Sequence, residues 1–132
     1  MKVLNELLYS KSHEWVKLEE QKAYVGISDY ARTQLGQIVF IDLPAVGSTA
    51  ELDEPLAEVE SVKAVAEVIS PVSGTVLEVN EELMDNPEAL NEDAYESWLV
   101  LVELSDLAEL KILMNAHEYE EYCDGLSKEG EH

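Results

Sequence analysis

The chain has 132 residues and an apolar fraction of 46%, which is the size and composition of one folded domain, residues 1–132. Its 29 acidic and 8 basic side chains give a net charge of −21, so binding to nucleic acid or to an anionic membrane surface is disfavoured. The longest apolar run, residues 98–102, is far shorter than the ~20 residues of a membrane-spanning helix. A single cysteine, Cys123, allows no internal disulfide. We therefore expect a cytoplasmic domain with protein partners (a mitochondrial-matrix domain in a eukaryote, after removal of a transit peptide).

Strand-forming segments follow one another along most of the chain. They are rich in β-branched and aromatic residues and are separated by turn-forming residues. In chain order, the predicted strands are residues 15–18, 23–27, 38–41, 56–60, 64–69, 75–79 and 98–104. Glutamates stand at alternate positions in two of them, as Glu58, Glu60 and Glu67, which indicates a sheet with one solvent-exposed face.

Short helices are predicted between the strands and after the last one. The signals, in chain order, are Ser28 or Asp29 as a cap with Gly36 as the stop after Leu35, Asn86 before Pro87, and the capping pairs Asp106 with Glu109 and Asn115 with Glu118. Many short strands with helices at the end of the chain predict a small β-barrel or β-sandwich, with the terminal helices packed on its outside.

The sequence has few of the patterns that mark catalytic or metal sites. It contains no glycine-rich phosphate loop and no pair of cysteines for zinc. His13-Glu14 begins like a zinc-protease motif, but Lys17 stands where the second histidine should be. His117 begins a second partial match, which fails at Glu121. We therefore expect no metal site and no catalytic residues.

Lys63 is the one residue that the surrounding sequence singles out. It is the only basic residue between positions 33 and 110, a segment with 18 acidic residues. It also lies between two predicted strands, so it should stand at the tip of a tight hairpin, exposed and held in place. Such a lysine suits acylation by a modifying enzyme, although an exposed lysine without a role has the same pattern.

The sequence around Lys63 resembles the lipoyl attachment region of the glycine cleavage system H proteins. The resemblance lies in the run Glu60, Ser61, Val62, Lys63, Ala64, followed by residues 70–76. Further blocks agree in order and spacing, namely residues 12–16, 26–31, 35–40, 42–47 and 91–95. The similarity extends over about residues 5–125, and the blocks together are highly specific although each alone is weak.

The resemblance implies a mainly β fold, a small flattened β-barrel or barrel-sandwich hybrid of lipoyl type with short helices and a C-terminal helical segment. It implies lipoic acid in amide linkage to Lys63, attached by a lipoate ligase or lipoyl transferase that reads Glu60, Ser61, Val62 and Ala64 as the attachment motif. It implies a non-catalytic carrier that takes the aminomethyl group of glycine from a pyridoxal-phosphate glycine decarboxylase to a tetrahydrofolate-dependent aminomethyltransferase. Dihydrolipoamide dehydrogenase would then reoxidise the arm.

The resemblance also implies that the loaded arm folds back into a cleft beside the N-terminal segment. The matching positions are Ser12 and Glu14, with Glu67 just beyond the attachment hairpin. A carboxylate in that cleft would favour the loaded arm, which carries a positive charge, over the neutral oxidised arm.

Three alternatives remain open at this stage. A lipoyl domain of a 2-oxo-acid dehydrogenase usually has Asp before the lysine, and a biotin carrier has Met on both sides, whereas this chain has Val62 and Ala64. An H-like protein could serve lipoate transfer or another lipoyl-dependent redox system. The chain could also be an interaction protein that is never modified.

Overall fold

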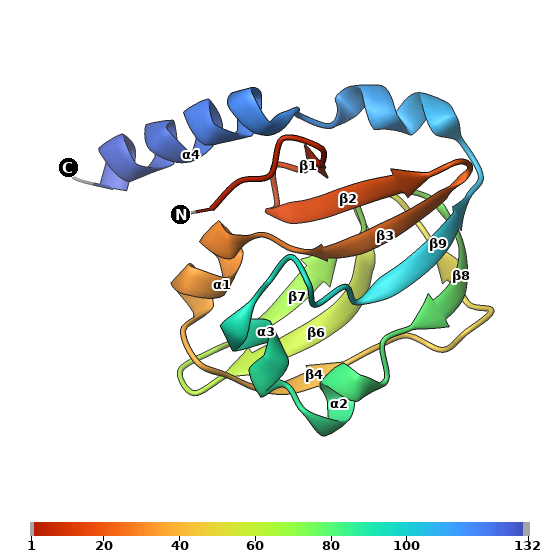
Figure 1. The fold of residues 1–132 in the computed structure, drawn as a ribbon, viewed down its shortest axis with the longest axis horizontal. Helices are drawn as coiled ribbons and strands as arrows, with labels where there is room; N and C mark the ends of the chain where they lie inside the picture. The colour runs from red at the N-terminus through yellow and green to blue at the C-terminus, as the bar shows by residue number, and fades with distance from the viewer. Residues whose placement is uncertain (1, 131–132) are drawn as a thin grey trace.

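The computed structural model describes residues 2–130, which form two antiparallel sheets with short helices around them (Figure 1). The larger sheet has the strand order β1-β2-β3-β9-β8-β5, and the smaller sheet has the order β4-β6-β7. The larger sheet comprises β1 (Leu8–Tyr9), β2 (Glu14–Glu19), β3 (Lys22–Ile27), β5 (Thr49–Ala50), β8 (Gly74–Val79) and β9 (Val100–Leu104). The smaller sheet comprises β4 (Ile38–Asp42), β6 (Pro55–Ser61) and β7 (Val65–Ile69).

The two sheets share one hydrophobic core because alternate residues of their strands point inward. Val16, Val25 and Val102 contribute from the larger sheet, and Val59 and Val68 contribute from the smaller one. All five side chains are buried. The predicted mainly β class is confirmed, and two sheets around a shared core fit the barrel-sandwich hybrid architecture.

Within residues 2–130, five helical segments accompany the sheets: α1 (Asp29–Leu35), α2 (Glu82–Asp85), α3 (Glu88–Glu92), the 3₁₀ helix η1 (Leu107–Ile112) and α4 (Ala116–Gly130). The signals predicted for α1 are confirmed, because the Ser28 hydroxyl accepts a hydrogen bond from the Ala31 N–H and Gly36 ends the helix with φ 82°. The capping box of Asn115 and Glu118 is also confirmed, since each side chain accepts from the other's backbone N–H. None of the described helices is long and apolar enough to span a membrane.

Three sequence predictions are wrong in detail. The last strand begins at Val100 rather than at residue 98. Asn86 ends α2 instead of capping α3, whose N-cap position is Pro87. The pair Asp106 and Glu109 forms only half of a capping box, because the Glu109 carboxylate accepts hydrogen bonds from the backbone and side chain of Ser73. Glu109 thus bonds to Ser73, which is distant in sequence, instead of to the nearby backbone N–H of Asp106.

A second hydrophobic cluster lies between α4 and the larger sheet. The ring of Tyr119 on α4 stacks on Tyr9 of β1, with centroids 4.4 Å apart, and Cys123 is buried beside them. Trp15 of β2 belongs to the same cluster and packs over Gly26, where any side chain would collide with the indole ring. Figure 1 shows α4 running along β1 and the N-terminal segment. The terminal helix therefore packs on the outside of the β structure, as predicted.

Candidate functional site: two hairpin turns

The first turn, which we call the attachment turn, consists of residues 61–64 between β6 and β7. Its backbone closes through a 2.8 Å hydrogen bond from the Ser61 N–H to the Ala64 carbonyl. The Ser61 hydroxyl accepts hydrogen bonds from the N–H groups of Lys63 and Ala64, so the buried serine fills the inside of the turn. Val62 and Lys63 are left exposed at the tip. The predicted position of Lys63 at an exposed hairpin tip is therefore confirmed.

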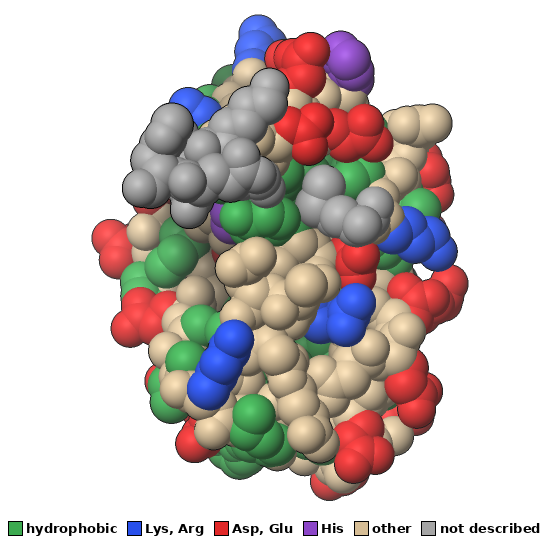
Figure 2. Space-filling model, turned by 90° about the vertical axis from the view of Figure 1, so that its left-hand side faces the viewer, with side chains coloured by type: hydrophobic (Ala, Val, Ile, Leu, Met, Phe, Trp, Pro, Cys, Tyr) green, Lys and Arg blue, Asp and Glu red, His purple; other side chains and the backbone are tan. Residues whose placement is uncertain are grey.

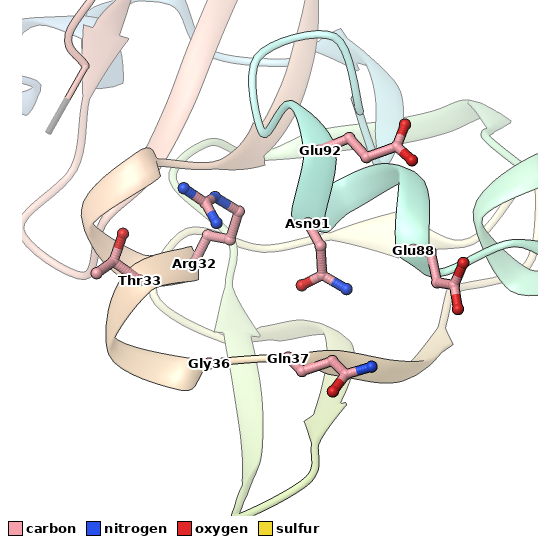
Figure 3. A pocket seen from close by; sticks show the side chains of 7 residues that line it. All are labelled: Arg32, Thr33, Gly36, Gln37, Glu88, Asn91 and Glu92. Atoms are coloured by element: carbon pink, nitrogen blue, oxygen red, sulfur yellow. The ribbon is translucent and has the colours of Figure 1, made fainter.

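The Lys63 side chain extends toward the end of α1. A Cβ atom built on Gly36 would lie 3.6 Å from Lys63 Cε, so the lysine stem passes close to this glycine. The φ of 82° at Gly36 favours glycine there independently of the lysine. Beyond Gly36 lies an open pocket of about 630 Å³ between α1 and α3, shown in Figure 3. Its wall carries Arg32, Thr33, Gly36, Gln37, Glu88, Asn91 and Glu92.

A side-chain amide on α3 supports the base of the attachment turn. Asn91 accepts a hydrogen bond from the Ile38 N–H and donates one to the Ile38 carbonyl. The preceding residue, Gln37, accepts a 3.0 Å bond from the Val62 N–H through its carbonyl. A continuous chain of contacts thus runs from α3 through β4 to the residue beside Lys63.

Carboxylates flank the attachment turn on the outer face of the smaller sheet. Asp42, Glu58 and Glu67 lie opposite one another in a single row across β4, β6 and β7. In another row Glu60 lies between the exposed side chains of Phe40 and Val65. Seen end-on from the side of α1 and this hairpin, acidic side chains gather toward the edge, while basic side chains stand in the middle among uncharged ones (Figure 2). A partner at the turn would therefore meet a few basic side chains, Lys63 among them, in an otherwise uncharged area with an acidic border.

The second turn, which we call the Glu14 turn, consists of residues 10–14 between β1 and β2. Glu14 is only 2% exposed, and its carboxyl oxygen Oε1 accepts hydrogen bonds from the hydroxyls of Ser10 and Ser12. Burial raises the pKa of Glu14 to about 7, although both serine bonds favour the ionised form. A carboxyl group that titrates near neutral pH beside a cleft is a candidate functional group.

The cleft beside the Glu14 turn has a volume of about 540 Å³. Its polar side is formed by Ser10, Lys11, Ser12, Asp53 and Ser70, and its apolar side by Leu52, Ile69, Pro71, Ile112 and Leu113. Glu14 lies behind Ser10 and Ser12, and their hydroxyls connect its carboxyl group to the cleft. Ile69 ends β7, whose first residue Val65 follows the attachment turn. The strand that leads from the attachment turn to the wall of the cleft is therefore five residues long, or ~13 Å.

The structure brings together some of the residues that the sequence proposed for the cleft and separates another. Ser12 and Glu14 are hydrogen bonded to each other. Glu67 lies instead beside Asp42 and Glu58, where all three line a different, 240 Å³ pocket on the outer face of the smaller sheet. Ser10, which sequence reasoning missed, donates the second hydrogen bond to the Glu14 carboxyl group. Its only sequence signal is its position two residues before Ser12.

Comparisons with known proteins agree on one family. The family model described as "Glycine cleavage H-protein" matches residues 7–125. A glycine cleavage system H protein of Clostridium botulinum (strain Loch Maree / Type A3) is 53% identical over 129 residues, 98% of this chain and 99% of the relative. One from Halalkalibacterium halodurans is 56% identical over 118 residues, which cover 89% and 92%. The crystal structure of a glycine cleavage system H protein from Mycobacterium marinum matches with a TM-score of 0.82 and 35% identity, covering 89% and 95%.

Proposed function

The chain belongs to the glycine cleavage H-protein family, and from this premise we propose that it is the lipoyl carrier of a glycine cleavage system. It would be a non-catalytic carrier, with residues 1–132 as a single domain and lipoic acid on Lys63. The observation that carries the assignment is the exposed Lys63 on a turn closed by its own backbone and by Ser61. An acylating enzyme needs an accessible amine in a reproducible position, and this turn supplies both.

The residues around Lys63 and the cleft fit a lipoyl group. Gly36 leaves room for the lysine stem, and the cleft combines an apolar wall with the hydroxyls of Ser10 and Ser12. When bound, the group supplies a disulfide that can be reduced and can accept the aminomethyl group. The contribution of the chain is to present the attachment point, exclude water from part of the arm and offer Glu14 near the bound end.

The partners would be the enzymes that act in turn on the arm: a pyridoxal-phosphate glycine decarboxylase, a tetrahydrofolate-dependent aminomethyltransferase and dihydrolipoamide dehydrogenase. A lipoate ligase or lipoyl transferase would load Lys63. Tethering supports this function because a linked group reaches each site at high effective concentration without leaving the carrier. A buried free thiol at Cys123 fits a reducing compartment, and we place the protein in the cytoplasm on that ground.

Reconstitution tests the function as a whole. Lipoylated protein, a glycine decarboxylase and carboxyl-labelled glycine should release labelled CO₂, whereas the unmodified protein should support no release. A lipoylated protein that is inactive here but donates lipoate to a second lipoyl domain would favour the alternative, an H-like protein in lipoate transfer.

We further propose that Ser12 and Glu14 hold the loaded arm, with Ser10 taking the place expected for Glu67. A cationic group beside Glu14 would stabilise the carboxylate and lower its pKa from about 7. The buried carboxyl group would therefore lose its proton as the loaded arm enters the cleft. Glu14→Gln should speed ammonia release from the loaded protein in the absence of the transferase, and lipoylation of Lys63 should not change. An unaltered rate of release would remove Glu14 from arm binding.

A further inference from the structure

Two tyrosines of α4 contact the Glu14 turn on either side of Ser12. The Tyr122 hydroxyl donates a 3.1 Å hydrogen bond to the Lys11 carbonyl. The Tyr119 hydroxyl lies 2.8 Å from His13 Nδ1. The serine between them bonds directly to the Glu14 carboxyl group. The terminal helix therefore fixes both neighbours of a residue that faces the cleft.

The Glu14 turn has a conformation that needs such support. His13 has a φ of 75°, in the left-handed region that is costly for a residue with a side chain. Its ring is stacked on Tyr30, with centroids 4.5 Å apart, and contacts Tyr119 and Tyr122 of α4 at 5.7 Å each. Strained backbone persists where surrounding contacts hold it, and here several of those contacts come from α4.

The contacting end of α4 is itself firmly placed. Tyr119 is fully buried, stacks on Tyr9 and has its hydroxyl 2.6 Å from that of Ser28, the residue that caps α1. Cys123, one turn later, is also buried. The helix is thus anchored on the larger sheet through residues near its start, as its course in Figure 1 indicates. Because α4 is fixed on the sheet, its tyrosines can hold the neighbouring Glu14 turn in one conformation.

We propose that Tyr119 and Tyr122 are positioning residues for the arm cleft: through His13 and the Lys11 carbonyl they hold the Glu14 turn in the geometry that places Ser12 at the cleft. The inference rests on the proposed function of that cleft. Neither tyrosine is among the residues that line the cleft, and they act only through the turn. The terminal helix would thereby influence how long a loaded arm stays sheltered, although it lies outside the arm site.

Tyr122→Phe is the sharper variant for the test because it removes one hydroxyl from a half-buried ring, whereas Tyr119→Phe would leave Ser28 and His13 without a buried partner. Tyr24→Phe is the matched control, since Tyr24 is a half-buried tyrosine on β3 that packs against Trp98. The first readout is the titration of the Glu14 carboxyl carbon by NMR in the unmodified protein. The second is ammonia release from the loaded protein.

With Tyr122→Phe the turn should open more often, by about fivefold for one lost hydrogen bond, and water should reach Glu14. The pKa of Glu14 should then fall from about 7 toward its ordinary value, and ammonia release should become severalfold faster. Tyr24→Phe should change neither quantity. The cleft also contains Lys11 and Asp53, with His13 in the turn, but these groups are the same in all the variants.

Glu14→Gln separates this inference from the proposed function. If Glu14→Gln speeds ammonia release and Tyr122→Phe changes neither readout, the cleft holds the arm but the positioning role is wrong. If Glu14→Gln leaves release unaltered, the cleft proposal is wrong, and the NMR titration still decides whether Tyr122 holds the turn. A response of Tyr24→Phe equal to that of Tyr122→Phe would also overturn the inference.

Discussion

The attachment turn and the Glu14 turn are built from similar parts and differ in what surrounds them. Each joins two antiparallel strands, and each has a buried serine, Ser61 or Ser10, bonded to the backbone inside the turn. The attachment turn projects Lys63 into solvent with support only at its base. The Glu14 turn points its carboxyl group inward and is covered by α4.

The difference indicates how one small fold can both present a group and shelter it. The attachment turn is closed by local bonds and is held from one side by the Gln37 carbonyl, and its exposed tip leaves Lys63 accessible to an enzyme. The Glu14 turn depends on long-range contacts, so its geometry can be changed without affecting Lys63. Variants of the attachment turn should therefore change the rate of lipoylation, and variants of the Glu14 turn should change the pKa of Glu14, with little effect of either on the other.

The largest loss of stability is expected for Asn91→Ala, at the base of the attachment turn. The substitution leaves the buried N–H and carbonyl of Ile38 without their partners, which should cost about 3 kcal/mol of unfolding free energy. Initial lipoylation rates should fall while the pKa of Glu14 stays near 7. Asn5→Ala, on the exposed surface, is the control for urea unfolding and should have little effect. A shifted Glu14 titration would show that the two turns are coupled.

Glu14→Gln should change how stability depends on pH. Because folding raises the pKa of Glu14 to about 7, the folded state holds this proton more tightly than the unfolded chain does. The contribution of Glu14 to the unfolding free energy is fully present below the pKa that Glu14 has in the unfolded chain. It is lost as the pH rises toward 7. The variant lacks that loss and should be more stable than the parent protein by roughly 2–3 kcal/mol at pH 8, and similar to it near pH 4. If the unfolding free energies of the two proteins changed with pH in parallel, folding would not raise the pKa of Glu14.

Ser61→Ala and Ser10→Ala form a matched pair, because each removes one hydroxyl group from the inside of one turn. Either loss should cost about 1 kcal/mol. Ser61→Ala should slow lipoylation and leave Glu14 unaffected, because it loosens only the backbone around Lys63. Ser10→Ala should raise the pKa of Glu14, since a donor to the carboxylate is lost while the contacts of α4 still keep the turn closed, with lipoylation unchanged. If either variant changes both the rate of lipoylation and the pKa of Glu14, the two turns do not act independently.

The smallest effect is expected on the row of carboxylates beside the attachment turn. Glu58 lies opposite both Asp42 and Glu67, so Glu58→Gln should relieve repulsion and stabilise the protein by about 0.5 kcal/mol. Glu103→Gln makes the same change in net charge on β9, but there it removes an acidic neighbour of Lys22 and should be neutral or destabilising. Thermal melting at low and high salt would measure the difference, which should shrink as salt screens the charges.

Sequence reasoning predicted the attachment turn better than the Glu14 turn for a physical reason. The tip position of Lys63 follows from two alternating strands and a short polar break, which are local signals. The contacts of Tyr119 and Tyr122 with the Glu14 turn join residues more than 100 positions apart, and no local pattern encodes them. The placement of Glu67 shows the same limit, because its register with Glu58 puts it on the outer face of the smaller sheet, away from Glu14.

The proposed carrier function requires Lys63 as the only site of lipoylation. The decisive measurement is the intact mass, with fragmentation, of the protein after incubation with a lipoate ligase, lipoate and ATP. Lys22→Arg is the matched control, since Lys22 is also an exposed lysine beside a hairpin turn, between β2 and β3. The parent protein and Lys22→Arg should each gain one lipoyl group, located on Lys63, and Lys63→Arg should gain none. A lipoyl group on Lys63→Arg, or on any other lysine of the parent protein, would contradict the account.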